Sequence, residues 1–210
     1  PTTVAMQWEA VAINADFWSQ VLQSKSLKPL DFALGAVMVT RRKQLAEIGG
    51  FRALVDCLAD DYQLGHRIAK CGHRIELCPV VVDCWSSPMG WRDVWKHQLR
   101  WARTIRVCQP APYFASILSN ATLWPLLWFA LCPSELVFKC TGALLIWRLV
   151  LSGDLLFQLT RMCPSFVGLL FVPIKDVLQF AIWLCAFAGN TVEWRGEKYR
   201  MKRDGTIVRR

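Results

Sequence analysis

The chain has 210 residues, of which 54% are hydrophobic and 12% aromatic, and its formal net charge is +9. This apolar and basic composition is unusual for a soluble domain and indicates a membrane protein whose charged parts face an anionic cytoplasmic leaflet. The basic residues flank apolar segments without a zinc pattern or an aromatic-basic sheet motif, which argues against nucleic acid as a partner. The nine cysteines form no CxxC pair, which favours free thiols over disulfides or structural zinc.

Residues 1–90 alternate between patterns typical of helices and of strands. Apolar spacing, acidic helix starts and glycine stops define the helices, and β-branched runs define the strands. The alternation predicts a layered α/β unit that is too strand-poor to be a complete nucleotide-binding fold. The expected helices cover 8–21, 41–48 and 60–71, and the expected strands cover 32–40 and 74–82.

Residues 91–112 predict an amphipathic helix that lies at the membrane surface. One stripe is largely apolar, and the opposite face is basic, as suits the boundary between anionic headgroups and acyl chains. The stripe contains Trp91, Val94, Trp95, Gln98, Trp101, Ala102 and Ile105, and the basic face Arg92, Lys96, Arg103 and Arg106. Within this helix the sequence HQLRW spaces His97, Arg100 and Trp101 so that all three can face one site.

Residues 113–190 predict a helical membrane region, and residues 191–210 form a basic tail that is expected in the cytoplasm. We expect two spans plus a third segment that either spans the membrane or is re-entrant. Three full spans would separate the tail from the α/β part, so one non-spanning segment is the preferred solution. The three apolar segments cover 117–132, 136–151 and 166–188, and Pro173 interrupts the last.

Two adjacent carboxylates, Asp60 and Asp61, are candidates for general-base chemistry. A glycosyl transfer with inversion needs a carboxylate that takes a proton from the attacking hydroxyl, and a neighbouring carboxylate can orient that base or raise its proton affinity. The alternative is that both residues cap a helix and complement its dipole.

Four further residues are candidates for binding substrate. Arg100 can stabilise a departing diphosphate or can bind lipid phosphate. Trp101 can stack on a sugar or form a wall of the acceptor site, or it can anchor the helix in the interface. His97 can bond a diphosphate oxygen, help hold a metal, or serve a structural purpose. Gly35 allows close backbone approach to a ligand or to a packing neighbour.

Four segments in order along the chain resemble family 2 glycosyltransferases and, within them, the ceramide glucosyltransferases, including their bacterial hopanoid-associated branch. They are Asp31 to Phe51, LADDYQLG at Leu58 to Gly65, HQLRWART at His97 to Thr104, and VEWRGEKYRM at Val192 to Met201. The last segment is similar to the cytoplasmic ending of ceramide glucosyltransferases, which processive polysaccharide synthases lack. In the third segment, His97 stands where the motif has Gln or Arg.

The resemblance implies a partial GT-A-type nucleotide-sugar transferase domain followed by an α-helical membrane region. It implies transfer of glucose from UDP-glucose to a lipid hydroxyl, ceramide above all, with inversion. Asp61 corresponds to the catalytic base and Asp60 to its acidic neighbour, while Arg100 and His97 would face the diphosphate and Trp101 the acceptor. The catalytic part and the tail would face the cytoplasm.

The same resemblance implies a divalent metal, Mg²⁺ or Mn²⁺, whose main ligands are aspartates in a part of the family that this sequence does not match. The chain contains no DxD sequence, and we therefore expect it to be the C-terminal half of an enzyme. Two alternatives stay open. One is the transfer of another sugar, such as N-acetylglucosamine, to a hopanoid or other lipid, and the other is a non-catalytic membrane protein that binds lipid.

Overall fold

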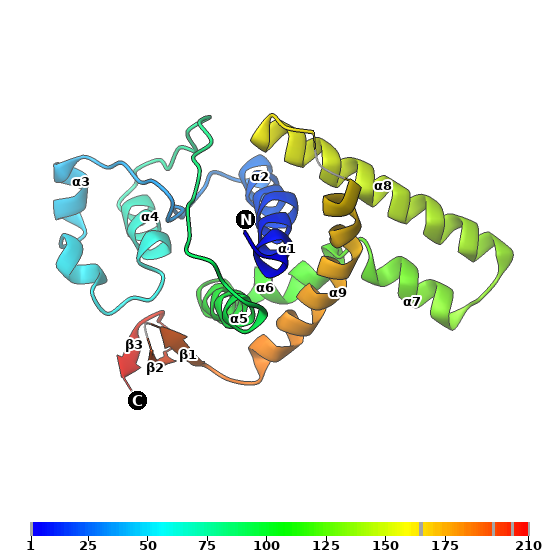
Figure 1. Cartoon of the computed structure of the whole chain (residues 1–210). Coiled ribbons are helices and arrows are strands. Elements are labelled where there is room, and N and C mark those ends of the chain that lie inside the picture. The colour runs from blue at the N-terminus through cyan, green and yellow to red at the C-terminus, as the bar shows by residue number, and fades with distance from the viewer. Residues whose placement is uncertain (1, 164–165, 195, 203, 210) are drawn as a thin grey trace. The chain divides into compact units, whose positions relative to one another are not determined.

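The computed structural model describes residues 2–163, 166–194, 196–202 and 204–209 (Figure 1). Helices make up 63% of it, and a small antiparallel sheet of order β1-β2-β3 lies near the C-terminus. The chain divides into two compact units, each built from two stretches of sequence. Unit 1 is Pro1–Ser19 with Ser87–Gly189, and unit 2 is Gln20–Ser86 with Asn190–Arg210.

The helices expected at 8–21, 41–48 and 60–71 are present, and the first is longer than expected. The helix expected over 91–112 ends at Cys108, and a separate short helix begins at Pro110. The helical elements are α1 (Val4–Ala12), the π-helix η1 (Ile13–Phe17), α2 (Trp18–Leu27), α3 (Arg42–Glu47), the 3-10 helix η2 (Phe51–Leu54), α4 (Asp60–Lys70), α5 (Trp91–Cys108), α6 (Pro110–Ala115), the 3-10 helix η3 (Ser116–Ser119), α7 (Leu123–Leu131), α8 (Glu135–Thr160) and α9 (Phe166–Phe187). The strands are β1 (Thr191–Trp194), β2 (Glu197–Met201) and β3 (Ile207–Arg209).

The two strands expected at 32–40 and 74–82 are wrong. In the described chain, the pairing there is one isolated antiparallel bridge between Leu30 and Ile75. Val39 is 95% exposed and Val80 67% exposed, so no neighbouring strand or helix covers these side chains. A β-branched run becomes a strand only when partners complete its hydrogen bonds and bury one face. The α/β expectation for residues 1–90 therefore gives way to a mostly helical arrangement.

Unit 2 packs α4 against α3 and η2 through a small core of Leu54, Leu64 and Ile68. Gly65 on α4 meets the segment before α3 at very short range, since an added Cβ would lie 2.1 Å from the Ala33 nitrogen. No other residue type allows this backbone contact.

The tail, read from the sequence as a basic extension, instead folds into the β1-β2-β3 sheet. Its third strand is joined to the rest of unit 2, where the Ile207 N–H donates to the Asp56 carbonyl at 2.7 Å.

Unit 1 has its core where α1, α5, α6 and α9 meet. The buried residues there are Ala5, Trp8, Val94, Ala102, Tyr113, Ile182 and Ala186. Two of them, Val94 and Ala102, come from the apolar stripe that predicted the amphipathic helix. The core therefore seats α5 on α1, and this contact positions the HQLRW segment.

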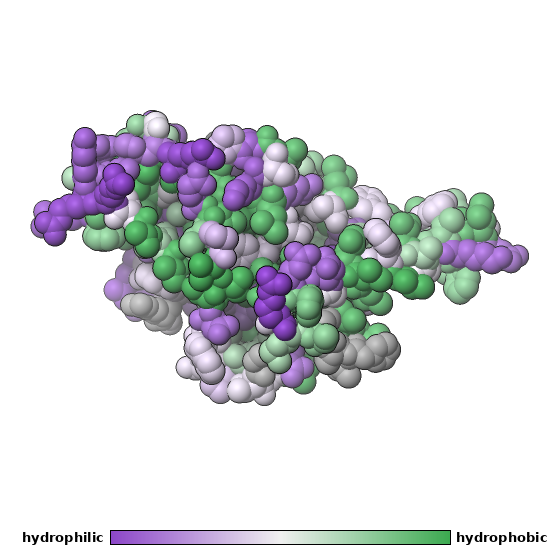
Figure 2. Space-filling model, turned by 90° about the horizontal axis from the view of Figure 1, so that it is seen from above, coloured by the Kyte–Doolittle hydropathy of each residue, from purple (hydrophilic) through white to green (hydrophobic). Residues whose placement is uncertain are grey.

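Two helices of unit 1, α8 and the Gly168–Phe187 part of α9, are long and apolar enough to cross a membrane. The third segment (166–188) is a single helix despite Pro173. By contrast, the first segment (117–132) belongs to a pair of shorter helical pieces, Pro110–Ser119 and Leu123–Leu131, bent by 58°. Large apolar side chains point outward along α8, and Figure 2 shows hydrophobic surface on the α7–α8 part. Such a surface suits lipid better than water.

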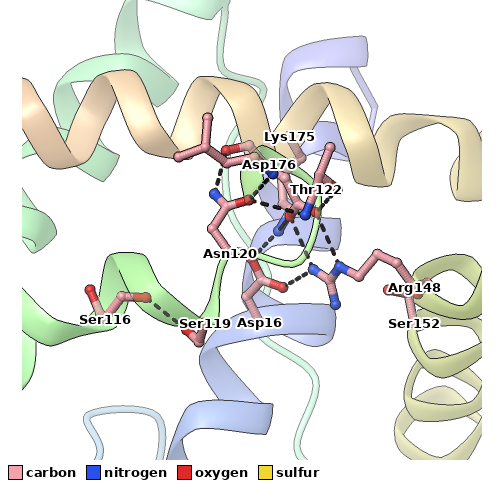
Figure 3. A network of polar contacts seen from close by, with 10 residues as sticks. Asp16, Ser116, Ser119, Asn120, Thr122, Arg148, Ser152, Lys175 and Asp176 are labelled. Atoms are coloured by element: carbon pink, nitrogen blue, oxygen red, sulfur yellow. Dashed lines mark hydrogen bonds and ion pairs between the residues drawn. The ribbon is translucent and has the colours of Figure 1, made fainter. Parts of the chain in front are cut away.

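A buried network of charges joins three elements of unit 1, η1, α8 and α9 (Figure 3). Asp176 on α9 accepts hydrogen bonds from Arg148 on α8, at 3.1 and 3.0 Å, and is ion-paired with Lys175. Asp16 on η1 binds both cations. Arg148 lies in the middle of α8, and both of its ion-pair partners come from other helices. Two anions and two cations balance, which is how buried charges are tolerated.

Asn120 and Thr122 tie the break of the bent pair to the same network. The Asn120 side chain donates to the Asp176 carbonyl at 2.9 Å and accepts the Leu123 N–H at 2.9 Å. The Thr122 hydroxyl donates to the Asp176 carboxylate. Because these contacts satisfy backbone groups freed at the break, the bend is held in place by specific partners.

Candidate active site

The carboxylate pair lies in unit 2 at the start of α4. Asp60 is exposed and accepts the Asp61 N–H at 3.0 Å, while Asp61 is half-buried and accepts the Tyr62 N–H at 2.7 Å. Burial raises the pKa of Asp61, the charge of Asp60 adds to this rise, and the N–H groups of Tyr62 and Gly35 oppose it. Since the net shift is upward, Asp61 binds a proton more readily than an ordinary aspartate does.

Gly35 is the close neighbour of that carboxylate. A Cβ built on Gly35 would lie 2.8 Å from Asp61 Oδ2, a distance that non-bonded carbon and oxygen atoms do not tolerate. The close backbone approach expected at Gly35 is therefore present, and the group approached is the Asp61 side chain. The glycine leaves the carboxylate accessible at its exposed edge, because no side chain at position 35 covers it.

An aromatic column stands beside the pair on α4. Tyr62 stacks between Phe32, with ring centroids 6.3 Å apart, and His66, with centroids 5.3 Å apart. Tyr62 and His66 stand four residues apart on α4, so helical spacing alone brings their rings together. The contact with Phe32 joins a distant segment, and no local pattern predicts it.

The HQLRW residues lie in unit 1 on α5, where they meet α1 and η1. The His97 ring packs on Trp101, with centroids 4.6 Å apart, and Trp101 in turn contacts Phe17 at 6.1 Å. His97 Nδ1 lies 2.7 Å from Glu9 Oε1, and the Gln98 amide donates to the same oxygen at 2.9 Å. The i,i+4 pairing of His97 with Trp101 that the helical spacing predicted is thus present.

Arg100 is half-buried, and its guanidinium makes no hydrogen bond or salt bridge with another described residue. Burial lowers the pKa of Arg100, and the negative charge of Glu9 opposes this shift. A guanidinium stays charged in proteins, so it presents donors that an anionic ligand can use. Bidentate recognition of phosphate is the interaction that such a group makes best.

Sequence reasoning missed Glu9, although a signal was present. It is the sole acidic residue in the first fifteen and stands within an apolar helical stretch, VAMQWEAVA. An acid in such a stretch is rarely buried without partners, and Glu9 is 5% exposed.

The candidate residues fall into two groups that lie in different units. Unit 2 contains Asp60, Asp61 and Gly35, and unit 1 contains His97, Arg100 and Trp101.

Among the described residues, the side chains do not by themselves complete a site for a divalent metal. Over the described residues, no group of three or more histidine, cysteine, aspartate or glutamate side chains is placed to hold a metal ion. Asp60 and Asp61 supply two carboxylates, and Mg²⁺ commonly completes its octahedral coordination with waters and substrate phosphates. The pair could therefore contribute to a metal site only together with ligands from outside the described side chains.

Comparison with known proteins gives one family. The family model described as Glycosyl transferase family 21 matches residues 1–207. No curated protein and no solved structure matches the chain significantly.

Proposed function

The chain belongs to glycosyl transferase family 21, and from this premise we propose that it transfers glucose from UDP-glucose to the hydroxyl of a membrane lipid, ceramide, with inversion. Membership of the family supports a glycosyltransferase role with a sugar donor and an acceptor. The match agrees with the resemblance to ceramide glucosyltransferases. The family is number 21, whereas the sequence motifs indicated family 2. The donor, the acceptor and the stereochemistry are the proposal.

The observation that carries the mechanism is the environment of Asp61. In the transfer step, the acceptor oxygen bonds to C1 of the sugar, the bond from C1 to the diphosphate oxygen breaks, and the hydroxyl proton passes to Asp61. A base with a raised pKa is suited to accept that proton. Its carboxylate is oriented by the Tyr62 and Gly35 N–H groups, so little reorganisation is needed when the hydroxyl arrives.

The opposite end of the reaction releases negative charge on the diphosphate. Arg100 supplies a half-buried guanidinium with donors left for an anion, and His97 supplies a ring nitrogen. Both strengthen their interaction as the leaving group gains charge, which is the requirement for lowering the barrier. Trp101 offers an indole face to the acceptor, and Asp60 orients Asp61 and supports its proton affinity.

The proposal includes the membrane arrangement. If α8 and α9 both cross, they run antiparallel because residues 161–165 alone join them, so Glu135 and Phe187 lie at the same membrane face. Tyr113 of α6 contacts Phe187, with centroids 5.7 Å apart. At the other end of the bent pair, α7 stops at Leu131, close in sequence to Glu135. The pair thus enters and leaves at one face, as a re-entrant segment.

This arrangement places the non-spanning segment before the two spans, a choice that the sequence pattern left open. It leaves α5 and the basic tail on one side, and the excess of Lys and Arg assigns that side to the cytoplasm.

Two native cysteines test the arrangement. Cys132 follows α7 and Cys163 follows α8, and both are exposed. In single-cysteine variants on sealed vesicles, an impermeant maleimide should label Cys132 from the cytoplasmic face and Cys163 from the other. Labelling with the faces exchanged would contradict this arrangement.

The transfer itself is tested with the native protein in liposomes that contain ceramide, diacylglycerol or a hopanoid, with labelled UDP-glucose or UDP-N-acetylglucosamine. We expect glucosylated ceramide, and a fall of about 10²- to 10⁴-fold in rate for Asp61→Asn with donor binding largely kept. Asp83→Asn, in an exposed loop, is the matched control and should have no effect.

Each other outcome points to a named alternative. Transfer of N-acetylglucosamine, or transfer to a hopanoid, would replace the substrates. Lipid binding without UDP binding or turnover would favour a non-catalytic membrane protein, the reading that the missing DxD supports. Activity of Asp61→Asn close to that of the wild type would remove Asp61 as the base.

A further inference from the structure

Glu9 is a buried carboxylate for which the mechanism above has no use. It lies on α1, and its side chain is 7% exposed. Burial alone would raise the pKa of Glu9, but the hydrogen bonds from His97 and Gln98, together with the positive charge of Arg100, outweigh burial and lower it. The group is therefore an anion held inside the protein by its partners.

The contacts of Glu9 fall on consecutive positions of the HQLRW segment. One oxygen, Oε1, binds both His97 Nδ1 at 2.7 Å and the Gln98 amide at 2.9 Å. The carboxylate also attracts Arg100. One side chain of α1 thus acts on three of the five residues in this segment.

The bond to Nδ1 decides which nitrogen of His97 is left for a ligand. A carboxylate at Nδ1 keeps a proton on that nitrogen, whatever the charge of the ring. Among the described residues, Nε2 has no hydrogen-bond partner. The packing of the ring on Trp101 at 4.6 Å limits its rotation. The ring is thus held with Nε2 as its available nitrogen.

We infer that Glu9 is a positioning residue for the leaving-group end of the reaction, which orients His97 so that Nε2 meets the departing diphosphate. This inference rests on the proposed transferase function. With UDP bound, Nδ1 keeps its hydrogen bond to Glu9 while Nε2 meets a phosphate oxygen. A buried partner of this kind lets a histidine occupy the position where the motif has Gln or Arg.

The first experiment compares Glu9→Gln, Glu9→Asp and the wild type in the liposome assay. Glu9→Gln keeps the size of the side chain and removes its charge. Glu9→Asp keeps the charge but shortens the side chain by one methylene, which moves the carboxylate away from His97. We expect kcat to fall by about 10- to 100-fold in Glu9→Gln with the donor KM little changed, and partial recovery in Glu9→Asp. Glu135→Gln, which breaks an exposed ion pair with Lys139, is the control and should behave as wild type.

A double-mutant cycle separates positioning from general stabilisation. If Glu9 acts through His97, adding Glu9→Gln to His97→Gln should cause no further loss of kcat, since contacting residues are not additive. Full additivity, or a kcat of Glu9→Gln equal to that of the wild type, would overturn the inference. So would a loss of activity explained wholly by a smaller folded fraction.

A second measurement does not depend on turnover. The chain has three histidines, so ¹⁵N-histidine spectra of the protein can be assigned by comparison with His97→Gln. We expect a proton on Nδ1 of His97 in the wild type and loss of that preference in Glu9→Gln. Unchanged spectra would contradict the role of Glu9, whereas the expected spectra without any sugar transfer would contradict the proposed function alone.

Discussion

Two carboxylates, one in each unit, occupy opposite electrostatic environments. Asp61 in unit 2 is half-buried beside a second carboxylate, and its pKa is raised. Glu9 in unit 1 is more deeply buried, but two side-chain donors and an arginine surround it, and its pKa is lowered. Burial is the largest influence on the pKa of both groups and raises it in each, so the partners decide the direction of the net shift.

This difference assigns different work to the two groups. A carboxylate that lacks a cationic partner binds a proton readily and suits general-base chemistry, whereas one saturated by donors suits the orientation of its neighbours. Such contrasts identify roles better than the presence of acidic residues does. The difference between Asp61 and Glu9 leads to three expected results.

The largest effect is expected for Gly35→Ala. The new methyl group would lie 2.8 Å from Asp61 Oδ2, so the carboxylate must move. A displacement of about 1 Å can cost about 10²-fold in rate, and we expect a loss of that size in the liposome assay. Gly142→Ala on α8, where an added Cβ meets nothing within 4 Å, should keep full activity. A fully active Gly35→Ala would mean that the position of Asp61 is not critical.

A smaller effect, on stability, should distinguish the two carboxylates directly. Glu9→Leu leaves the donors of His97 and Gln98 buried without an acceptor, at a cost of about 1–3 kcal/mol, and should lower the apparent melting temperature in detergent. Asp61→Asn removes a charge that burial disfavours and should leave that temperature unchanged or raise it. Equal destabilisation by both substitutions would contradict the assignment of different roles.

The smallest effect is a shift in pH dependence. Because the charge of Asp60 raises the pKa of Asp61, Asp60→Asn lowers that pKa toward its ordinary value. The base must be deprotonated to act, so the acidic limb of the kcat/KM profile should move to lower pH by less than about one unit. A limb that stays in place, or moves to higher pH, would show that another group controls it.

The sequence predicted those elements whose signals are local. The start of α4 at Asp60, the stop of α3 at Gly49–Gly50 and the two-faced α5 follow from capping, glycine and periodicity, and each is present. The strands at 32–40 and 74–82 were wrong because strand formation depends on partners that a local pattern does not reveal. The sheet of the tail was missed for the same reason, since its charged residues hid its pairing.

For the candidate site, the sequence was enough to predict the residue types and their order, and the family match agrees with a glycosyltransferase. Helical spacing alone put His97, Arg100 and Trp101 on one face, because the geometry of a helix is fixed within a few residues. The three-dimensional structure was needed to find that Gly35 meets Asp61, that Glu9 binds His97, and that Arg148 pairs with Asp16 and Asp176. Each of these contacts joins residues that are far apart in the chain. Their energies depend on burial between packed elements, and no local sequence pattern encodes that burial.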